Sequence, residues 1–138
     1  MKRIMCICTA LLLLLTGCTT LVPDPLPTES STYGIYEFTF SVEQLSGEPT
    51  DAWDFIYTYN GETITSGHQI CFSLGIFTFH SIQVDVIEKV ACGNTYNATF
   101  PVAICNGGTG KTELTATNSN GKVATFKITC QVSQVGRQ

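Results

Sequence analysis

The chain has 138 residues, of which 43% are hydrophobic and only 13% are charged, and its formal net charge is −4. A disordered chain shows the opposite balance, with low hydrophobicity and a high net charge. An acidic excess without any basic cluster also argues against nucleic acid as a partner.

The first residues have the pattern of an export signal. Lys2 and Arg3 precede an apolar run over residues 4–15 that only Thr9 interrupts. A positive start, an apolar core of about 7–15 residues and small residues at the cleavage site are typical of a secretory signal. A membrane-spanning helix needs about 20 apolar residues, so this run is too short to be one.

The segment ends in Leu15-Thr16-Gly17-Cys18, which resembles the lipobox of bacterial lipoproteins. The resemblance implies that residues 1–17 are a signal peptide, that cleavage follows Gly17, and that Cys18 carries the acyl chains. One acyl chain binds a membrane only marginally, whereas two or three make release negligible. The expected partner is therefore a membrane, held through Cys18. The alternatives are an ordinary secretory signal with a chance cysteine and a cytosolic protein with a buried first helix.

The cysteine count supports lipidation independently. Of seven cysteines, Cys6 and Cys8 would leave with the signal and lipid would occupy Cys18. Four would remain, and an even number in an exported protein fits two disulfides. These four are Cys71, Cys92, Cys105 and Cys130.

Residues 18–33 are predicted to form a tether between the lipid and a folded domain. Pro23, Pro25 and Pro27 alternate with other residues, and each proline fixes its own φ and favours extended geometry before it. At about 3.1 Å per residue the tether could hold the domain some 40 Å from the membrane. The alternative is a segment packed against the domain.

The residues around the tether bear on location and charge. The residue directly after Cys18 is Thr19. An aspartate at this position would resemble an inner-membrane retention signal of Gram-negative bacteria, so Thr19 favours the outer membrane. The first acidic residue after Cys18 is Asp24, so the periplasmic or surface-facing side stays open. Five of the seven basic residues would survive cleavage against eleven acidic ones, a side-chain charge of −6. Attachment to an anionic membrane would then depend on the acyl chains.

Residues 34–138 are predicted to be one all-β domain, because short strand-like runs alternate with turn signals. These runs occupy residues 36–42, 53–59, 69–74, 76–80, 82–87, 96–105, 112–117 and 122–131. In the first run Tyr36, Phe38, Phe40 and Val42 share one face. Pro101 would remove a hydrogen-bond donor, so its strand should be an edge strand or bulged there.

Two turns have the chemistry of tight hairpins. Asn60-Gly61 follows the second run, and Asn120-Gly121 ends a turn between two alternating runs. Asn and Gly tolerate the left-handed backbone that such turns require. Residues 112–129 are therefore expected to form a hairpin, with Leu114 and Ala116 alternating on one arm.

Residues 114–125 resemble the final hairpin of bacterial Ig-like and PKD-type domains, and Trp53-Asp54-Phe55 resembles a PKD motif. The motif departs from PKD at Ile56-Tyr57-Thr58, where Gly-Asp-Gly would be expected. The resemblance covers about a fifth of the chain. It implies an Ig-like antiparallel β-sandwich of about seven to eight strands, acting as an adhesive, spacer or recognition module, although a fold alone does not define a function.

Four cysteines allow three pairings, and the sequence cannot decide among them. We favour Cys92–Cys105 with Cys71–Cys130, because residues 92–105 could fold back near Asn94. Free thiols are the alternative. No Cys-x-x-Cys motif and no ligand spacing between His68 and His80 is present, so neither a metal nor another cofactor is expected.

No motif of a known catalytic class occurs in the chain, so we do not expect an enzyme. His68 lies in a predicted turn and His80 lies between two strand-like runs. Trp53, flanked by Asp51 and Asp54, could form a ligand platform with Tyr57 and Tyr59. The competing interpretation makes Trp53 the core tryptophan of the sandwich.

The sequence favours an envelope lipoprotein with a non-catalytic binding or spacer module, whose partners would be envelope proteins or glycans. The first alternative is an accessory scaffold lipoprotein of a conjugation or secretion apparatus. The second is a carbohydrate-binding or hydrolytic protein. Exposed aromatic residues around Trp53 would favour ligand binding, and an exposed edge strand at residues 96–105 would favour assembly by strand addition.

Overall fold

The computed structural model describes residues 33–47 and 49–138. The described residues belong to one compact unit, Ser31–Gln138. The predicted signal peptide, Cys18 and residues 18–32 of the predicted tether lie outside the described residues. The elements are β1 Tyr33–Ser46, a 3-10 turn Thr50–Ala52, β2 Trp53–Tyr59, β3 Glu62–Ile64, β4 His68–Ser73, β5 Phe79–Glu88, β6 Thr95–Ala103, β7 Thr109–Thr117 and β8 Val123–Arg137.

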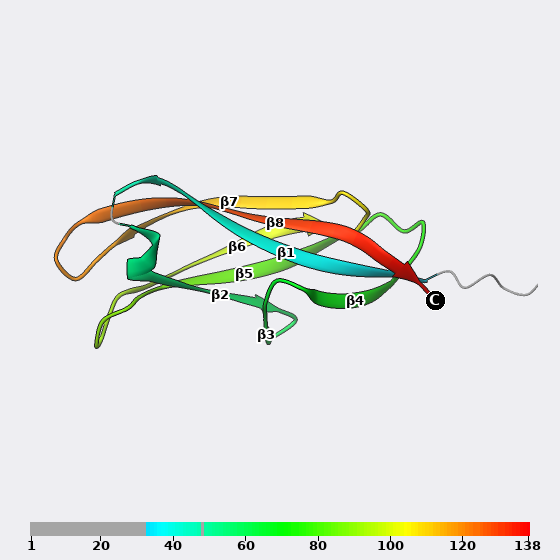
Figure 1. Cartoon of the computed structure of the whole chain (residues 1–138), viewed down its shortest axis with the longest axis horizontal. Coiled ribbons are helices and arrows are strands. Elements are labelled where there is room, and N and C mark those ends of the chain that lie inside the picture. Colours follow the sequence, from blue (N-terminus) through cyan, green and yellow to red (C-terminus); the bar gives the residue numbers. More distant parts are fainter. Residues whose placement is uncertain (1–32, 48) are drawn as a thin grey trace, which may run out of the picture. The chain divides into compact units, whose positions relative to one another are not determined.

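The strands form two four-stranded sheets with the orders β4-β1-β8-β7 and β3-β2-β5-β6 (Figure 1). All of the strand pairs are antiparallel. The predicted antiparallel β-sandwich of about seven to eight strands is therefore confirmed. Its first and last strands, β1 and β8, pair at the centre of one sheet.

The connectivity can be compared with the Ig order, from which it differs at strands A and D. In Ig domains strands A, B, E and D face strands C, F and G, and some members add C′ beside C. If β1 is taken as strand B, the sheet β3-β2-β5-β6 has the order C′-C-F-G. The neighbours of β1 then follow, because β4 takes the place of E and β8 takes the place of A. In this comparison strand A comes last, strand D has no counterpart among the described strands, and β7 is an additional strand beside A.

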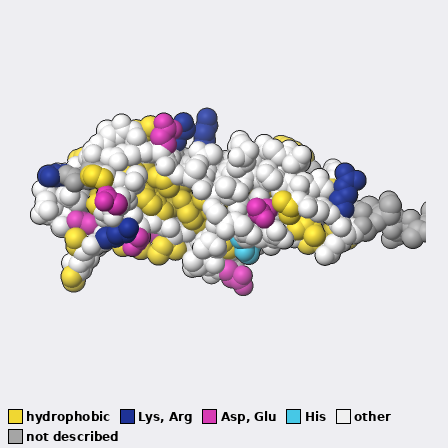
Figure 2. All heavy atoms as spheres, viewed as in Figure 1, with side chains coloured by type: hydrophobic (Ala, Val, Ile, Leu, Met, Phe, Trp, Pro, Cys, Tyr) yellow, Lys and Arg dark blue, Asp and Glu magenta, His cyan; other side chains and the backbone are white. Residues whose placement is uncertain are grey.

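The core forms where the inward faces of the two sheets meet. Side chains alternate across a strand, so every second residue of β1, β5 and β8 points inward. Phe38, Ile82 and Phe126 are fully buried in this way. Phe40 and Val42, the other end of the predicted β1 face, are partly buried against the same cluster. Some hydrophobic side chains stay at the surface, and Figure 2 shows a group of them in the left half of the view.

Both predicted turns close hairpins. Asn60 and Gly61 have φ angles of 49° and 83°, and they turn β2 into the short strand β3. In the second hairpin Leu114 pairs with Phe126. Its turn is held by Asn118, whose Oδ1 accepts hydrogen bonds from the backbone N–H groups of Asn120 and Lys122.

Several strand boundaries differ from the prediction. Residues 76–78 belong to a loop, and β5 is one strand from Phe79 because it pairs continuously with β6 from that residue onward. The three-residue strand β3 is too short to give an alternating signal. Pro101 lies on β6, opposite Ser81 of β5. Strand β6 is the edge of its sheet, as predicted.

The sandwich has two distinct ends. The turns β1–β2, β5–β6 and β7–β8 gather at one end (Figure 1, left). At the other end Tyr33 and Gln138 exchange backbone hydrogen bonds, and Tyr33 pairs with Ser73 just before the β4–β5 loop. The chain that leads back toward Cys18 therefore leaves the domain next to the β4–β5 loop.

Candidate functional site

The predicted aromatic platform is not a surface feature. Trp53, Tyr57 and Tyr59 are only 2%, 9% and 8% exposed, because they point from β2 into the space between the sheets. Trp53 meets Phe126 edge-on with 5.9 Å between ring centroids, and Tyr57 stacks on Phe40 at 3.9 Å. The platform interpretation is wrong, and the interpretation of Trp53 as the core tryptophan is confirmed.

The two carboxylates beside Trp53 face solvent. Asp54 forms an ion pair with Lys89, with 3.3 Å between Oδ1 and Nζ, and both side chains are exposed. Exposed ion pairs of this kind contribute little to stability. Within residues 33–47 and 49–138, no three His, Cys, Asp or Glu side chains come together as a metal site.

Both histidines lie beside Tyr59. The Tyr59 hydroxyl is 2.5 Å from His80 Nδ1, and the two rings are stacked. His68 stacks on Phe38 at the same side of the core. Burial raises the pKa of Tyr59, although a hydrogen bond with Asn60 lowers it in part. The hydroxyl therefore keeps its proton at neutral pH and can donate a hydrogen bond to His80 Nδ1. These histidines contact aromatic rings, which is a packing role.

The four cysteines Cys71, Cys92, Cys105 and Cys130 are free. Cys92 lies in the β5–β6 turn and Cys105 follows the far end of β6. A strand of this length spans about 30 Å at 3.3 Å per residue, whereas a disulfide needs Cα atoms within about 7 Å. Cys71 is on edge strand β4, which β1 separates from the strand of Cys130. The favoured pairings Cys92–Cys105 and Cys71–Cys130 are therefore wrong.

Cys130 is the most protected of these thiols. It is fully buried on β8, and burial raises its pKa to about 12. Burial and the neighbouring Cys130 also raise the pKa of Tyr57 to about 12, so both groups stay protonated at neutral pH. A protonated, buried thiol reacts poorly with electrophiles.

We expect iodoacetamide at pH 8 to modify the exposed Cys71 and Cys92 of the native protein rapidly. Cys130 should react only after unfolding, because its thiol is buried and protonated. Peptide mapping by mass spectrometry without reductant measures each site, and a denatured sample gives the full reactivity of Cys130. Detection of a Cys92–Cys105 disulfide peptide, or equal labelling of Cys130 and Cys71, would contradict this arrangement.

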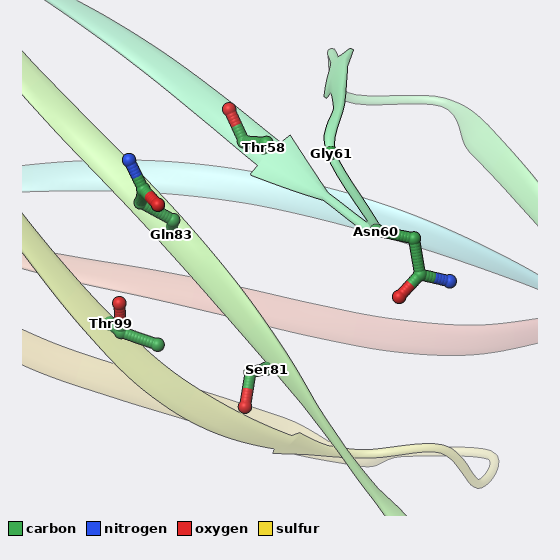
Figure 3. Close-up of a pocket in the computed structure, with 6 residues that line it drawn as sticks. All are labelled: Thr58, Asn60, Gly61, Ser81, Gln83 and Thr99. Atoms are coloured by element: carbon green, nitrogen blue, oxygen red, sulfur yellow. The ribbon is translucent and has the colours of Figure 1, made fainter.

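A polar depression of about 280 Å³ lies on the outer face of β2, β5 and β6 (Figure 3). Thr58 pairs with Gln83 and Gln83 pairs with Thr99, so their side chains form a row across the sheet. Asn60, Gly61 and Ser81 complete the lining. Hydroxyl and amide groups can hydrogen-bond a neutral polar ligand. The row carries neither a charged group nor an aromatic ring.

A buried carboxylate that the sequence reasoning missed joins two turns. Glu88, at the end of β5, is 6% exposed. Its carboxylate accepts hydrogen bonds from the N–H and the hydroxyl of Ser119, at 3.0 and 2.8 Å, and from the N–H of Asn94 at 3.2 Å. Burial alone would raise the pKa of Glu88, but these hydrogen bonds outweigh it and lower the pKa. The β5–β6 and β7–β8 turns are thereby fixed to each other.

Comparison with protein-family models, with curated proteins and with solved structures found no match to this chain. Within the described part of the chain, no helix has the length and hydrophobicity to cross a membrane. The described residues form an antiparallel β-sandwich with Trp53 in its core and a polar depression on the outer face of one sheet.

Proposed function

We propose that this protein is a bacterial envelope lipoprotein whose Ig-like sandwich is a non-catalytic binding or spacer module held on a membrane by Cys18. The observation that carries the proposal is the lipobox Leu15-Thr16-Gly17-Cys18 directly behind an apolar core. The membrane would be the outer membrane, since Thr19 follows the lipidated cysteine. Partners of the module would be envelope proteins or glycans.

The fold supports a module of this kind. Three turns gather at the end of the sandwich opposite to the point where the chain toward Cys18 leaves (Figure 1). Glu88 fixes two of them to each other, so they form a preorganised surface. Rigid scaffolds that present loops commonly carry binding residues on those loops. In this proposal the tether positions the domain and the turns face away from the membrane.

The edge strand β6 favours a second candidate, a scaffold lipoprotein of a conjugation or secretion apparatus. An unpaired edge can accept a strand from a partner. Pro101 removes one donor from this edge, so strand addition would use Thr95–Thr99. Cross-linking from Asn97 in the native envelope would detect such a neighbour, and a glycan-bound protein without cross-linked protein would favour the first candidate.

We expect the Cys18→Ala variant to lose its acyl chains and its attachment to the outer membrane when the full chain is expressed in a bacterial host. Its acyl chains could not be added, and the domain offers no spanning helix among the described residues. Membrane fractionation measures attachment. The intact mass should show that the wild-type protein has lost residues 1–17 and gained lipid.

Cys8→Ala is the matched control, because it also removes a cysteine near the N-terminus but leaves the lipobox unchanged. This variant should be processed and anchored like the wild type. Attachment of Cys18→Ala to the outer membrane at the wild-type level, or a wild-type mature mass without lipid, would overturn the proposal.

A further inference from the structure

The β4–β5 loop and the start of β5 expose an apolar surface. Ile76, Phe77 and Phe79 are 56%, 67% and 60% exposed, the highest fractions among the exposed large hydrophobic side chains of the described residues. We name these three residues the loop patch. The rings of Phe77 and Phe79 meet edge-on, with 5.1 Å between centroids, so they form one surface. Grouped exposed apolar side chains commonly mark a contact with a partner or a membrane.

The loop patch lies where the chain toward Cys18 leaves the domain. Tyr33 pairs with Ser73, and the loop begins at the next residue. The other side of the loop is fixed by a hydrogen bond from the Ile104 N–H to the Thr78 carbonyl. Tyr33 and Val135, which are also exposed, lie toward this same end of the sandwich. In Figure 2 hydrophobic side chains are visible at the surface toward the end where β8 finishes in Figure 1.

Charge at this end differs from charge on the rest of the domain. Residues 65–82 contain no acidic residue, and residues 131–138 contain only the basic Arg137. The chain as a whole is acidic, and Asp51, Asp54 and Glu88 lie toward the opposite end of the sandwich. Glu37, on β1 opposite Gln69 and Ser133, is the acidic side chain on the strands that lead to this end, and its carboxylate accepts a hydrogen bond from Gln69. An end with exposed aromatic rings and few carboxylates suits the membrane interface, where aromatic side chains are favoured and anionic head groups repel acids.

We propose that the loop patch inserts into the interface of the lipid bilayer to which Cys18 is anchored. This inference rests on the proposed lipid anchor. The tether, about 50 Å long for 16 residues at about 3.1 Å each, sets only an upper limit on the distance between bilayer and domain. Insertion gives the domain a second contact with the membrane, and this contact directs the β1–β2, β5–β6 and β7–β8 turns away from the bilayer.

The test uses the full-length lipidated protein in phosphatidylcholine vesicles, with and without lipid brominated on the acyl chains. The native Trp53 is buried in the sandwich and should not be quenched. The Phe77→Trp variant adds a tryptophan in the loop patch, and bromine should quench most of that added emission. Val90→Trp is the matched control, because Val90 is also exposed but lies in the β5–β6 turn at the opposite end.

Flotation of the vesicles separates the two proposals. Floating protein with a quenched Phe77→Trp signal and an unquenched Val90→Trp signal supports insertion. Floating protein with equal, weak quenching in both variants overturns insertion but leaves the lipid anchor intact. Protein that neither carries lipid nor floats overturns both. A Phe77→Ser/Phe79→Ser variant that dissociates a dimer, without quenching in Phe77→Trp, would identify the patch as a protein interface and overturn insertion.

Discussion

Replacing Trp53 by alanine should lower the free energy of unfolding by about 3–5 kcal/mol, the range measured for large aromatic residues removed from protein cores. The indole lies between the two sheets and contacts Phe126 and Tyr96 edge-on, at 5.9 and 6.5 Å between ring centroids. Its Nε1–H has no hydrogen-bond partner in the described structure, so the loss is one of packing. Urea unfolding followed by circular dichroism measures the change.

The matched control is Ile56→Ala on the same strand. Ile56 points to the outer face of β2 and is exposed, so its removal leaves no internal cavity. Surface substitutions of this kind usually change stability by about 0.5 kcal/mol or less. Similar losses for Trp53→Ala and Ile56→Ala would mean that Trp53 is not the core residue of the sandwich.

Local patterns predicted most of the strands because alternation is a property of neighbouring residues. Apolar residues alternate with polar ones around Tyr36 and Phe38 and along both arms of the hairpin at residues 112–129. These segments form β1, β7 and β8, with the expected faces turned inward. The alternation of Trp53, Phe55 and Tyr57 could not show whether this face was buried. That depends on which strand lies opposite, and Phe126 is far away in the sequence. The order of the strands in the two sheets was unpredictable for the same reason.

The errors at the cysteines and at the β4–β5 loop have one physical cause. A disulfide depends on where two strands end in space, and Cys92 and Cys105 lie at opposite ends of β6. Residues 76–80 contain three large apolar side chains and therefore resemble a buried strand, yet Ile76 and Phe77 lie in an exposed loop. Composition indicates that a segment is apolar, but only the packing of neighbouring strands decides whether it is covered.

Glu88 was missed because its partners are distant in the sequence. A single glutamate at the end of a strand resembles a surface residue, and nothing local connects it with Ser119, 31 residues later. The structure buries its carboxylate among three donors from two turns. Buried charged groups are rare unless they are paired or hydrogen-bonded, so the buried carboxylate of Glu88 requires these hydrogen-bond donors.

The Glu88→Gln variant should be less stable than the wild type at pH 7, with a lower melting temperature. The glutamine amide would place a donor N–H₂ group against the N–H groups of Ser119 and Asn94, so the buried donors would lose acceptors. Thermal unfolding measures the effect. Glu113→Gln, on the exposed surface of β7, is the matched control and should melt like the wild type.

The same carboxylate should make stability depend on pH. The folded protein holds the pKa of Glu88 below its ordinary value of about 4.3, because hydrogen bonds from Ser119 and Asn94 outweigh the opposing effect of burial. A group with a lowered folded pKa contributes stability above its unfolded pKa and loses that contribution as pH falls through the folded pKa. The difference in melting temperature between wild type and Glu88→Gln should therefore be constant from pH 7 to about 5 and shrink below about pH 4.3. A difference that stays unchanged down to pH 3 would show that the Glu88 charge does not hold the β5–β6 and β7–β8 turns together. The fixed arrangement of these two turns would then need another cause.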